Sequence, residues 1–288
     1  FSRCFGCVVS YWGGSMFNDM SSAERLSHHV SGQARPDADR SSADHADTIA
    51  GKRLVGLEIA STLSGMAFPE RRTAVLILSG LVRSECDICT LKATFNELMA
   101  AKAIPLLTAL RHHCPCTFRH ALRTMTFVMI IVRRLGIERQ EHASICAGAL
   151  LHDIGKLALP IDLLRLARKL KPAEMERIRQ HPEIGYEAIS DRRVFGWNAV
   201  LDIVRHHHER LDGTGYPLGL MGNQISLRTR CVSVADIFSA LTENRPYRAA
   251  LTAENAFRIL SDAAEAGKLD HQVVDALGSG LGLAVAPS

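Results

Sequence analysis

The sequence predicts an all-α protein, and two observations support that fold class. Leu and Ala are frequent, while aromatic residues make up only 6% of the chain, and this balance favours helices over strands. From residue 117 onward, apolar side chains recur at helical spacing in successive segments, with no alternating strand pattern between them. The 288 residues suffice for one large domain or two smaller ones, each with its own core.

The N-terminal part of the chain has a weaker pattern. Residues 1–50 carry no sustained apolar period and are rich in Ser, Asp, Arg, Ala and His, so we expect a poorly ordered tail or linker. Residues 51–110 are predicted to form a small, mostly helical region, in which Val75–Val82 is also compatible with a short strand. The helix expected over Thr90–Leu110 should break or kink at Pro105.

Residues 111–288 form the predicted main domain. A loop with four glycines lies between His208 and Arg228, and the rest reads as helices. The expected helices are Thr117–Leu135, Glu141–Leu151, Pro172–His181, Ile184–Ser190, Asn198–His206, Cys231–Thr242 and Ala253–Ala266.

Charge and cysteine usage exclude several classes of protein. A net charge of +4 is too small for a dedicated binder of nucleic acid polymers, although it suits a small anionic substrate. No apolar run reaches the ~18 residues of a membrane span, and no clear secretory leader is present, so we expect a cytoplasmic location. Eight cysteines indicate reduced thiols, with a zinc site at the two C-x-x-C pairs as the less favoured alternative. Those pairs are Cys4/Cys7 and Cys86/Cys89.

Several His and Asp residues stand at the ends or on the inner faces of apolar helices. His152 and Asp153 directly follow the apolar Leu150 and Leu151, where a buried carboxylate needs a partner such as a metal ion. Each such residue alone is better explained as a satisfied core or surface side chain. Together they indicate a metal site, and the further members are His120, His181, His206, His207, His208 and Asp236.

The motifs around these residues resemble the HD-GYP family, the branch of the HD phosphohydrolases that is linked to cyclic di-GMP breakdown. The resemblance covers residues 111–277, and its motifs occur in the family's order. They are His152–Lys156, His181–Gly185, His207–Pro217, Val234–Thr242 and Arg245–Arg248. The fold that it implies is an HD-type helical bundle.

The resemblance implies a binuclear centre of two divalent metal ions, iron or manganese in preference to zinc. One ion would be held by His120, His152, Asp153 and Asp236, and Asp153 would bridge to a second held by His181, His207 and His208. His206 is left outside the metal shell. Two such ions would turn a bridging water into a hydroxide nucleophile and neutralise the phosphate.

The remaining site residues follow from the same motifs. Lys156 would contact a phosphate oxygen, and Arg245 and Arg248 would bind the second phosphate or a guanine. A loop that contains Gly213, Gly215 and Tyr216 would shape the substrate site. The alternatives are a solvated lysine at residue 156 and an ordinary tight turn for the loop.

Two departures from the family pattern bear on the site. Cys116 stands where some members carry a Glu that supports a third metal, so we expect two metals and a buried, inert thiol. The less favoured alternative is a Cys116 thiolate that binds a soft metal. The segment Leu166–Arg168 replaces the family's usual Lys–Pro–Gly run, which weakens the expectation of substrate contacts there.

The function predicted is a metal-dependent phosphodiesterase that converts cyclic di-GMP to linear pGpG, GMP or both. One alternative is an HD phosphohydrolase that acts on another nucleotide. The other is a weakly active cyclic di-GMP-binding module that signals through diguanylate cyclases or other signalling proteins. A homodimer through the helix at Thr90–Leu110 is a further expectation.

Overall fold

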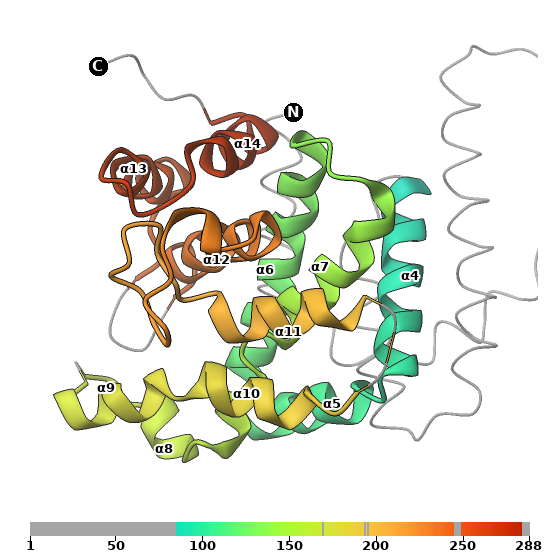
Figure 1. Cartoon of the computed structure of the whole chain (residues 1–288). Coiled ribbons are helices and arrows are strands. Elements are labelled where there is room, and N and C mark those ends of the chain that lie inside the picture. The colour runs from blue at the N-terminus through green and yellow to red at the C-terminus, as the bar shows by residue number, and fades with distance from the viewer. Residues whose placement is uncertain (1–84, 169, 193, 195, 245–248, 284–288) are drawn as a thin grey trace, which may run out of the picture. The chain divides into compact units, whose positions relative to one another are not determined.

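The computed structural model describes residues 85–283 except 169, 193, 195 and 245–248 (Figure 1). The expected tail over residues 1–50 and the helix-or-strand segment at Val75–Val82 lie outside the described residues, as do Arg245 and Arg248. All described residues belong to one compact unit.

The described residues are helical and contain no strand beyond an isolated bridge between Asp212 and Met221, so the predicted all-α fold is confirmed there. The α-helices are α4 (Glu85–Ala100), α5 (Ile104–His113), α6 (Pro115–Arg134), α7 (Arg139–Leu151), α8 (Ile161–Leu164), α9 (Pro172–Arg179), α10 (His181–Ile189), α11 (Trp197–His206), α12 (Leu227–Leu241), α13 (Ala253–Glu265) and α14 (His271–Leu281). Two 3-10 helices complete them, η2 (Ile154–Ala158) and η3 (Gly222–Gln224). None of the described helices is long and apolar enough to cross a bilayer.

Local sequence signals explain where several helices begin and end. The break expected at Pro105 is confirmed, because α4 ends at Ala100 and Pro105 lies in the first turn of α5. Gly136 follows α6 with a φ of 65°, a conformation that glycine adopts without steric cost. The expected start of α12 at Cys231 is four residues late, since the Ser226 side chain accepts a hydrogen bond from Thr229 N and caps the helix earlier.

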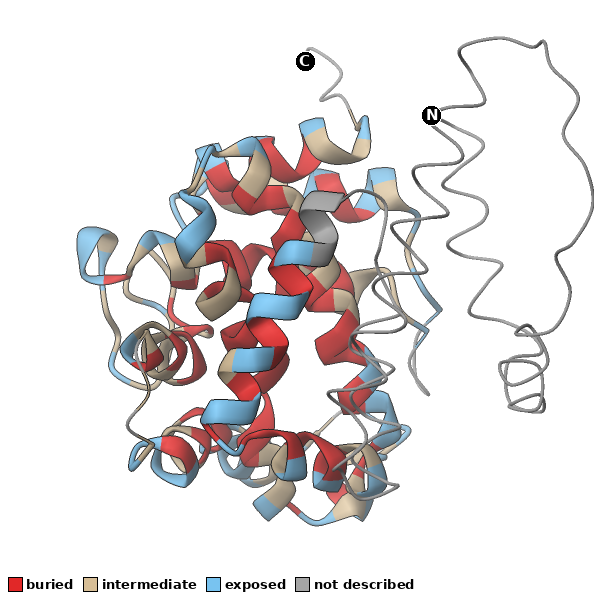
Figure 2. Cartoon of the chain, turned by 90° about the vertical axis from the view of Figure 1, so that its right-hand side faces the viewer, coloured by how far each residue is buried: buried red, intermediate tan, exposed pale blue. Residues whose placement is uncertain are grey.

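One apolar core holds the helices together. α6 contacts α5, α7, α12 and α14, and α7 also packs against α4 and α11. The buried residues of α6 include Met125, Val128 and Val132. Figure 2 colours the buried residues of the core red. The predicted division of the chain at residues 50 and 110 stays a prediction, and the described helices on both sides of residue 110 share this core.

The helix at Thr90–Leu110 was expected to carry a dimer interface. In the structure, Leu91, Phe95 and Leu98 of α4 are buried in the core of the chain's own main unit. The apolar face of α4 is therefore used within the chain, and a homodimer through this helix stays a prediction.

Two glycines let η2 approach α10 at backbone distance. A Cβ atom at Gly155 would lie 2.0 Å from the carbonyl oxygen of His181 and 2.6 Å from the amide nitrogen of Gly185. A Cβ at Gly185 would lie 3.1 Å from the amide nitrogen of Gly155. This close approach brings Asp153, just before η2, beside His181 at the start of α10.

The Gly155→Ala substitution is expected to destabilise the protein by about 3 kcal/mol or more, because the added methyl group meets rigid backbone atoms. Gly136→Ala is the control, since a Cβ there meets nothing within 4 Å, and only the left-handed backbone conformation costs about 1–2 kcal/mol. Urea unfolding measures both. Equal costs for the two variants would contradict the account.

Candidate metal centre

All seven predicted metal ligands come together in the structure as two neighbouring groups. His120 lies on α6 and Asp236 on α12, while His152 ends α7. The first group is His120, His152 and Asp236, and the second is Asp153, His181, His207 and His208. Within each group, one ligand atom per residue lies within 4.8 Å of every other.

Asp153 lies between the two groups. Its Oδ2 is 3.4 Å from Nε2 of His152, and its Oδ1 is 3.1 Å from Nε2 of His181. One carboxylate thus faces a histidine of each group, which is the placement that a bridging ligand requires.

Three of the histidines are oriented by the same kind of hydrogen bond to the backbone. Nδ1 of His152, His181 and His207 lies 2.7, 2.7 and 3.0 Å from the carbonyl oxygen three residues earlier in the chain. A carbonyl accepts only, so Nδ1 carries the proton and Nε2 presents a lone pair to the site. Metal-ligating histidines are commonly held in this way.

Unsatisfied buried atoms show that this donor set fits cations. Nε2 of His152 and Oδ1 of Asp153 are buried without a hydrogen-bond partner among the described residues. Nε2 of His181 lies 3.3 Å from Nε2 of His207, so two lone pairs face each other. A divalent cation shared by these atoms would satisfy them, and imidazole with carboxylate suits iron, manganese or zinc.

The two carboxylates of the centre are held ionised. Burial opposes the charge on Asp153, but Lys156 and His152 outweigh it and keep the pKa well below the usual range. Burial likewise opposes the charge on Asp236, whose pKa the hydrogen bond and charge of His120 hold well below its usual range. Both groups are therefore anionic at neutral pH, as metal-binding carboxylates are.

His120 has outer partners that the sequence did not reveal as such. Its Nε2 is 2.7 Å from Asp236 Oδ1, and its Nδ1 lies 3.2 Å from Ser239 Oγ and 3.7 Å from Glu243 Oε2. The available signal was spacing: Ser239 follows Asp236 by three residues and lies on the same face of α12, while Glu243 follows it by seven and lies just beyond the end of that helix.

Lys156 pairs directly with the Asp153 carboxylate. Its ammonium group donates to Asp153 Oδ2 at 2.7 Å, and its side chain is 19% exposed. The lysine therefore lies between the buried centre and solvent, although the predicted contact with a phosphate stays a prediction.

The Gly-rich loop is anchored by Glu209, a residue of the motif to which no role was assigned. Glu209 is 2% exposed. Its Oε1 accepts a hydrogen bond from Leu218 N at 2.6 Å, and its Oε2 accepts one from Leu220 N at 3.1 Å. Gly215 lies against the same residue, because a Cβ there would come within 2.4 Å of Glu209 Cα.

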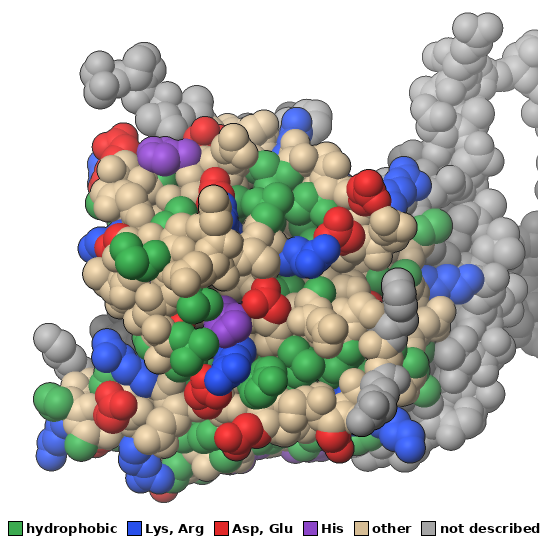
Figure 3. Space-filling view, in the orientation of Figure 1, with side chains coloured by type: hydrophobic (Ala, Val, Ile, Leu, Met, Phe, Trp, Pro, Cys, Tyr) green, Lys and Arg blue, Asp and Glu red, His purple; other side chains and the backbone are tan. Residues whose placement is uncertain are grey.

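The anchored loop places Tyr216 over His208, a member of the second candidate ligand group. The Tyr216 ring stacks on His208 with 4.7 Å between ring centroids, and the Arg179 guanidinium lies 5.3 Å from the Tyr216 centroid. Figure 3 shows a histidine reaching the surface between the end of α11 and this loop, with basic and acidic side chains beside it. The loop therefore borders the opening of the centre.

Other predicted residues have different surroundings. His206 binds Asp202 at 2.8 Å, outside both groups, where it was expected to lie. Arg168, in the segment that departs from the family loop, pairs with Glu174 at 2.7 Å. The expectation of a buried Cys116 is wrong, because that thiol is exposed and Cys114 is the buried one.

The two C-x-x-C pairs, the alternative zinc site, lie only partly within the described residues. Cys4 and Cys7 lie outside the described residues, as does the side chain of Cys86, and Cys89 is a free, exposed thiol.

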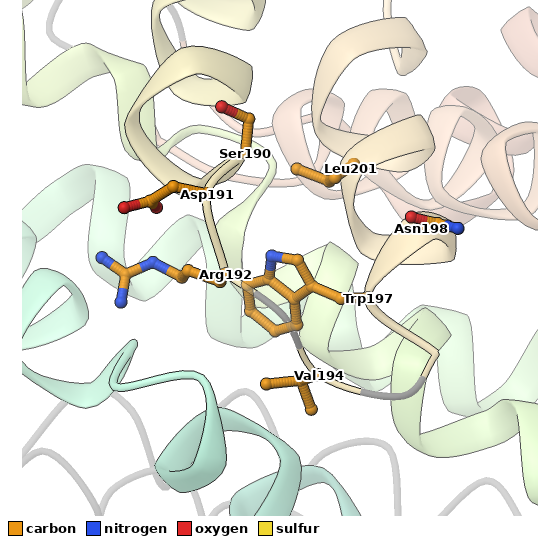
Figure 4. Close-up of a pocket in the computed structure, with 7 residues that line it drawn as sticks. All are labelled: Ser190, Asp191, Arg192, Val194, Trp197, Asn198 and Leu201. Atoms are coloured by element: carbon orange, nitrogen blue, oxygen red, sulfur yellow. The ribbon is translucent and has the colours of Figure 1, made fainter.

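A separate hollow of about 640 Å³ lies where the chain turns from α10 into α11 (Figure 4). Ser190, Arg192 and Trp197 are among its lining residues, and none of the lining residues belongs to the two ligand groups. The hollow is thus distinct from the candidate metal centre.

Comparison with known proteins supports the motif resemblance. A family model described as an HD domain matches residues 106–273, more than half of the chain. The chain is 42% identical over 149 residues to the cyclic di-GMP phosphodiesterase response regulator RpfG of Xanthomonas campestris, a match that covers 51% of this chain and 39% of that protein. It is 35% identical over 161 residues to the 3'3'-cGAMP-specific phosphodiesterase 1 of Vibrio cholerae, covering 56% of this chain and 37% of that protein.

A solved structure shares the fold. Bd1817, an HDG"Y"P protein from Bdellovibrio bacteriovorus, matches with a TM-score of 0.51 and 18% identity, over 74% of this chain and 77% of that one. At this identity the likeness concerns the fold alone. The chain spans less than half the length of the two curated relatives above. Together the family model and the relatives confirm the resemblance that the motifs indicate.

Glu209→Gln should destabilise the loop by about 1–3 kcal/mol, because the amide nitrogen of glutamine would face a backbone N–H in place of an acceptor oxygen. The exposed Glu176 offers a matched control, and Glu176→Gln should change stability by less than about 0.5 kcal/mol. Urea unfolding and the rate of proteolysis within residues 213–220 are the measurements. The anchoring role is refuted if both variants behave like the parent.

Acidification should destabilise the metal-free protein. Burial lowers the pKa of His207 and His208 well below the ordinary value, with neighbouring histidines adding to it at His207 and Asp236 opposing it in part at His208. The unfolded chain therefore takes up protons at these positions before the folded one. Their stabilisation is therefore present above the unfolded pKa of about 6.5 and is lost as pH falls below it. His152, whose pKa is raised despite its burial because Asp153 and Asp236 lie near it, opposes this in part.

Between about pH 7.5 and pH 5.5 we expect the free energy of unfolding, measured in urea with a chelator, to fall by about 1–3 kcal/mol. The double variant His207→Gln, His208→Gln should lose most of this pH dependence of the free energy of unfolding. A parent that gains stability on acidification would contradict the assigned direction.

Proposed function

Since this chain belongs to the HD domain family, we propose that it is a metal-dependent phosphodiesterase that hydrolyses cyclic di-GMP to linear pGpG, GMP or both. The observation that carries the proposal is the pair of buried His/Asp groups that meet at Asp153. Curated relatives named as cyclic di-GMP phosphodiesterases, including one from Thermotoga maritima at 35% identity, support the choice of substrate.

The centre is proposed to hold two divalent ions, iron or manganese. His120, His152 and Asp236 would bind one, His181, His207 and His208 the other, and Asp153 both. When bound, such a pair supplies an activated water and neutralises charge on the phosphate. Cytoplasmic location stays a prediction.

The chain's own residues would orient the substrate around that centre. Lys156, at the solvent side of Asp153, can turn its ammonium group to a phosphate oxygen when substrate enters. Gly213, Gly215 and Tyr216 form the loop that Glu209 holds over His208, so a guanine has a ring and backbone groups to contact. Arg245 and Arg248 are proposed as further substrate contacts from outside the described residues.

Two alternatives remain distinct from this proposal. The relative named as a 3'3'-cGAMP-specific phosphodiesterase favours a related cyclic dinucleotide as the alternative substrate. A binding module that signals through diguanylate cyclases or other signalling proteins would bind the dinucleotide with little turnover. Retention of all seven ligand residues in one centre supports an enzyme.

The proposal is tested by incubating the full chain, loaded with ferrous iron or manganese, with cyclic di-GMP and separately with 3'3'-cGAMP, and separating the products by chromatography. We expect linear pGpG or GMP from the parent, and a turnover at least about 100-fold lower, about 2.7 kcal/mol in barrier, from Asp153→Asn. Cleavage of 3'3'-cGAMP alone would select the alternative substrate. Equal turnover by parent and variant would contradict the site.

Lys156→Gln is expected to lower kcat/KM by about 10- to 100-fold, about 1.4–2.7 kcal/mol, because a cation that contacts the phosphate is lost. Lys171→Gln, at an exposed lysine before α9, is the control and should leave kcat/KM unchanged. Steady-state kinetics at saturating metal measure kcat/KM for the parent and both variants. The phosphate contact is wrong if both variants match the parent.

A further inference from the structure

Two thiols at the start of α6 have no role in the proposed hydrolysis. The Sγ atoms of Cys114 and Cys116 lie 2.9 Å apart. Cys114 is buried at the N-cap of α6, while Cys116, in its first turn, is exposed. One member of the pair is thus open to solvent, and the other is held directly behind it.

The geometry of the pair is close to that of a disulfide. An S–S bond is about 2.05 Å long, so the two sulfur atoms need to approach by less than about 1 Å. Cys114 has a φ of −139° and a ψ of 87°, which places it outside the helical conformation. The Cys114 backbone is held on both sides, since its N–H donates to Leu110 O at 2.8 Å and its carbonyl oxygen accepts from Phe118 N at 3.1 Å. Rotation of the two cysteine side chains therefore has to supply this small adjustment.

The surroundings favour the reactive thiolate form. Thr117 Oγ1 donates a hydrogen bond to Cys114 Sγ at 3.1 Å, and the N-terminus of the 20-residue helix α6 carries partial positive charge beside it. The hydrogen bond with Cys116, together with Thr117, outweighs burial and lowers the pKa of Cys114 to about 5. The same hydrogen bond, followed by burial, raises the pKa of Cys116 above its usual range. The pair therefore holds one shared proton and one negative charge at neutral pH.

We propose that Cys114 and Cys116 are a peroxide-sensitive dithiol that closes reversibly to a disulfide at the start of α6. The proton of Cys116 first moves to Cys114 across their hydrogen bond, and the exposed Cys116 thiolate that this leaves attacks hydrogen peroxide: an S–O bond forms, the O–O bond breaks, and the departing hydroxide leaves as water after taking a proton from solvent. Cys114 sulfur then attacks Cys116 sulfur, the S–S bond forms, the S–O bond breaks, and the oxygen leaves as water with the proton of Cys114. In total two thiols and one peroxide give one disulfide and two waters.

The position of the pair connects it to the metal centre. His120 follows Cys116 by four residues and therefore lies one turn further along the same helix. Lys156, which binds the bridging Asp153, is close enough to Cys114 to contribute to its lowered pKa. Closure of the disulfide acts on the helical turn that leads directly to a proposed metal ligand.

The test treats the full chain with about one equivalent of hydrogen peroxide, blocks free thiols with an alkylating reagent, and maps peptides by mass spectrometry without reduction. The expected result is a peptide with residues 114–116 that has lost two hydrogen atoms, escapes alkylation, and regains two alkylation sites after treatment with dithiothreitol. Cys231→Ser, at a buried cysteine outside the pair, should leave this result unchanged.

Cys116→Ser should abolish the oxidised peptide and leave Cys114 alkylated or singly oxygenated. The proposal is overturned if residues 114–116 remain dithiol while the exposed Cys89 oxidises, if both sulfurs become sulfinic acids without a bond, or if Cys116 links to a different cysteine. These outcomes concern peptide masses alone, so they are independent of whether cyclic di-GMP is hydrolysed.

Discussion

A single buried carboxylate, that of Asp153, is the constraint on which the rest of the centre depends. It is 1% exposed and ionised, and it faces a histidine of each ligand group. Leaving such a charge unpaired in a protein interior is costly. Apart from the histidines, Lys156 is the only cationic side chain of the described residues within hydrogen-bond distance of Asp153. Bound cations would complete the arrangement.

The surrounding fold can be understood as a means of holding this carboxylate in place. Gly155 and Gly185 let η2 touch α10, so that Asp153 meets His181. Carbonyl oxygens at the ends of three helices orient the histidines, and Glu209 fastens the loop that covers His208. Backbone contacts of this kind leave little freedom to the ligand atoms, which is what a preorganised metal centre requires.

Much of the centre could be predicted from the sequence, because its ligands lie in short motifs at the ends of strongly periodic helices. The α6, α7 and α11 helices follow from that periodicity, and the seven candidate ligands that the motif resemblance implies lie together in the two groups. Two features depend on tertiary placement and gave no signal of that kind. Cys116 was expected in the interior, but it is exposed in the first turn of α6. Glu209 anchors the loop through the backbone N–H groups of Leu218 and Leu220, which follow it by nine and eleven residues. The α14 helix was not expected, although Asp270 caps it by accepting from Gln272 N and Val273 N.

Magnetic coupling between two bound Mn²⁺ ions tests the central claim most directly, because coupling requires that both ions share a ligand at short distance. Ions in a two-metal site lie about 3.5–4 Å apart, close enough to couple. The account predicts a coupled electron paramagnetic resonance spectrum at two Mn²⁺ per chain and the spectrum of isolated ions in Asp153→Asn. An uncoupled spectrum in the fully loaded parent would contradict a centre built around one shared carboxylate.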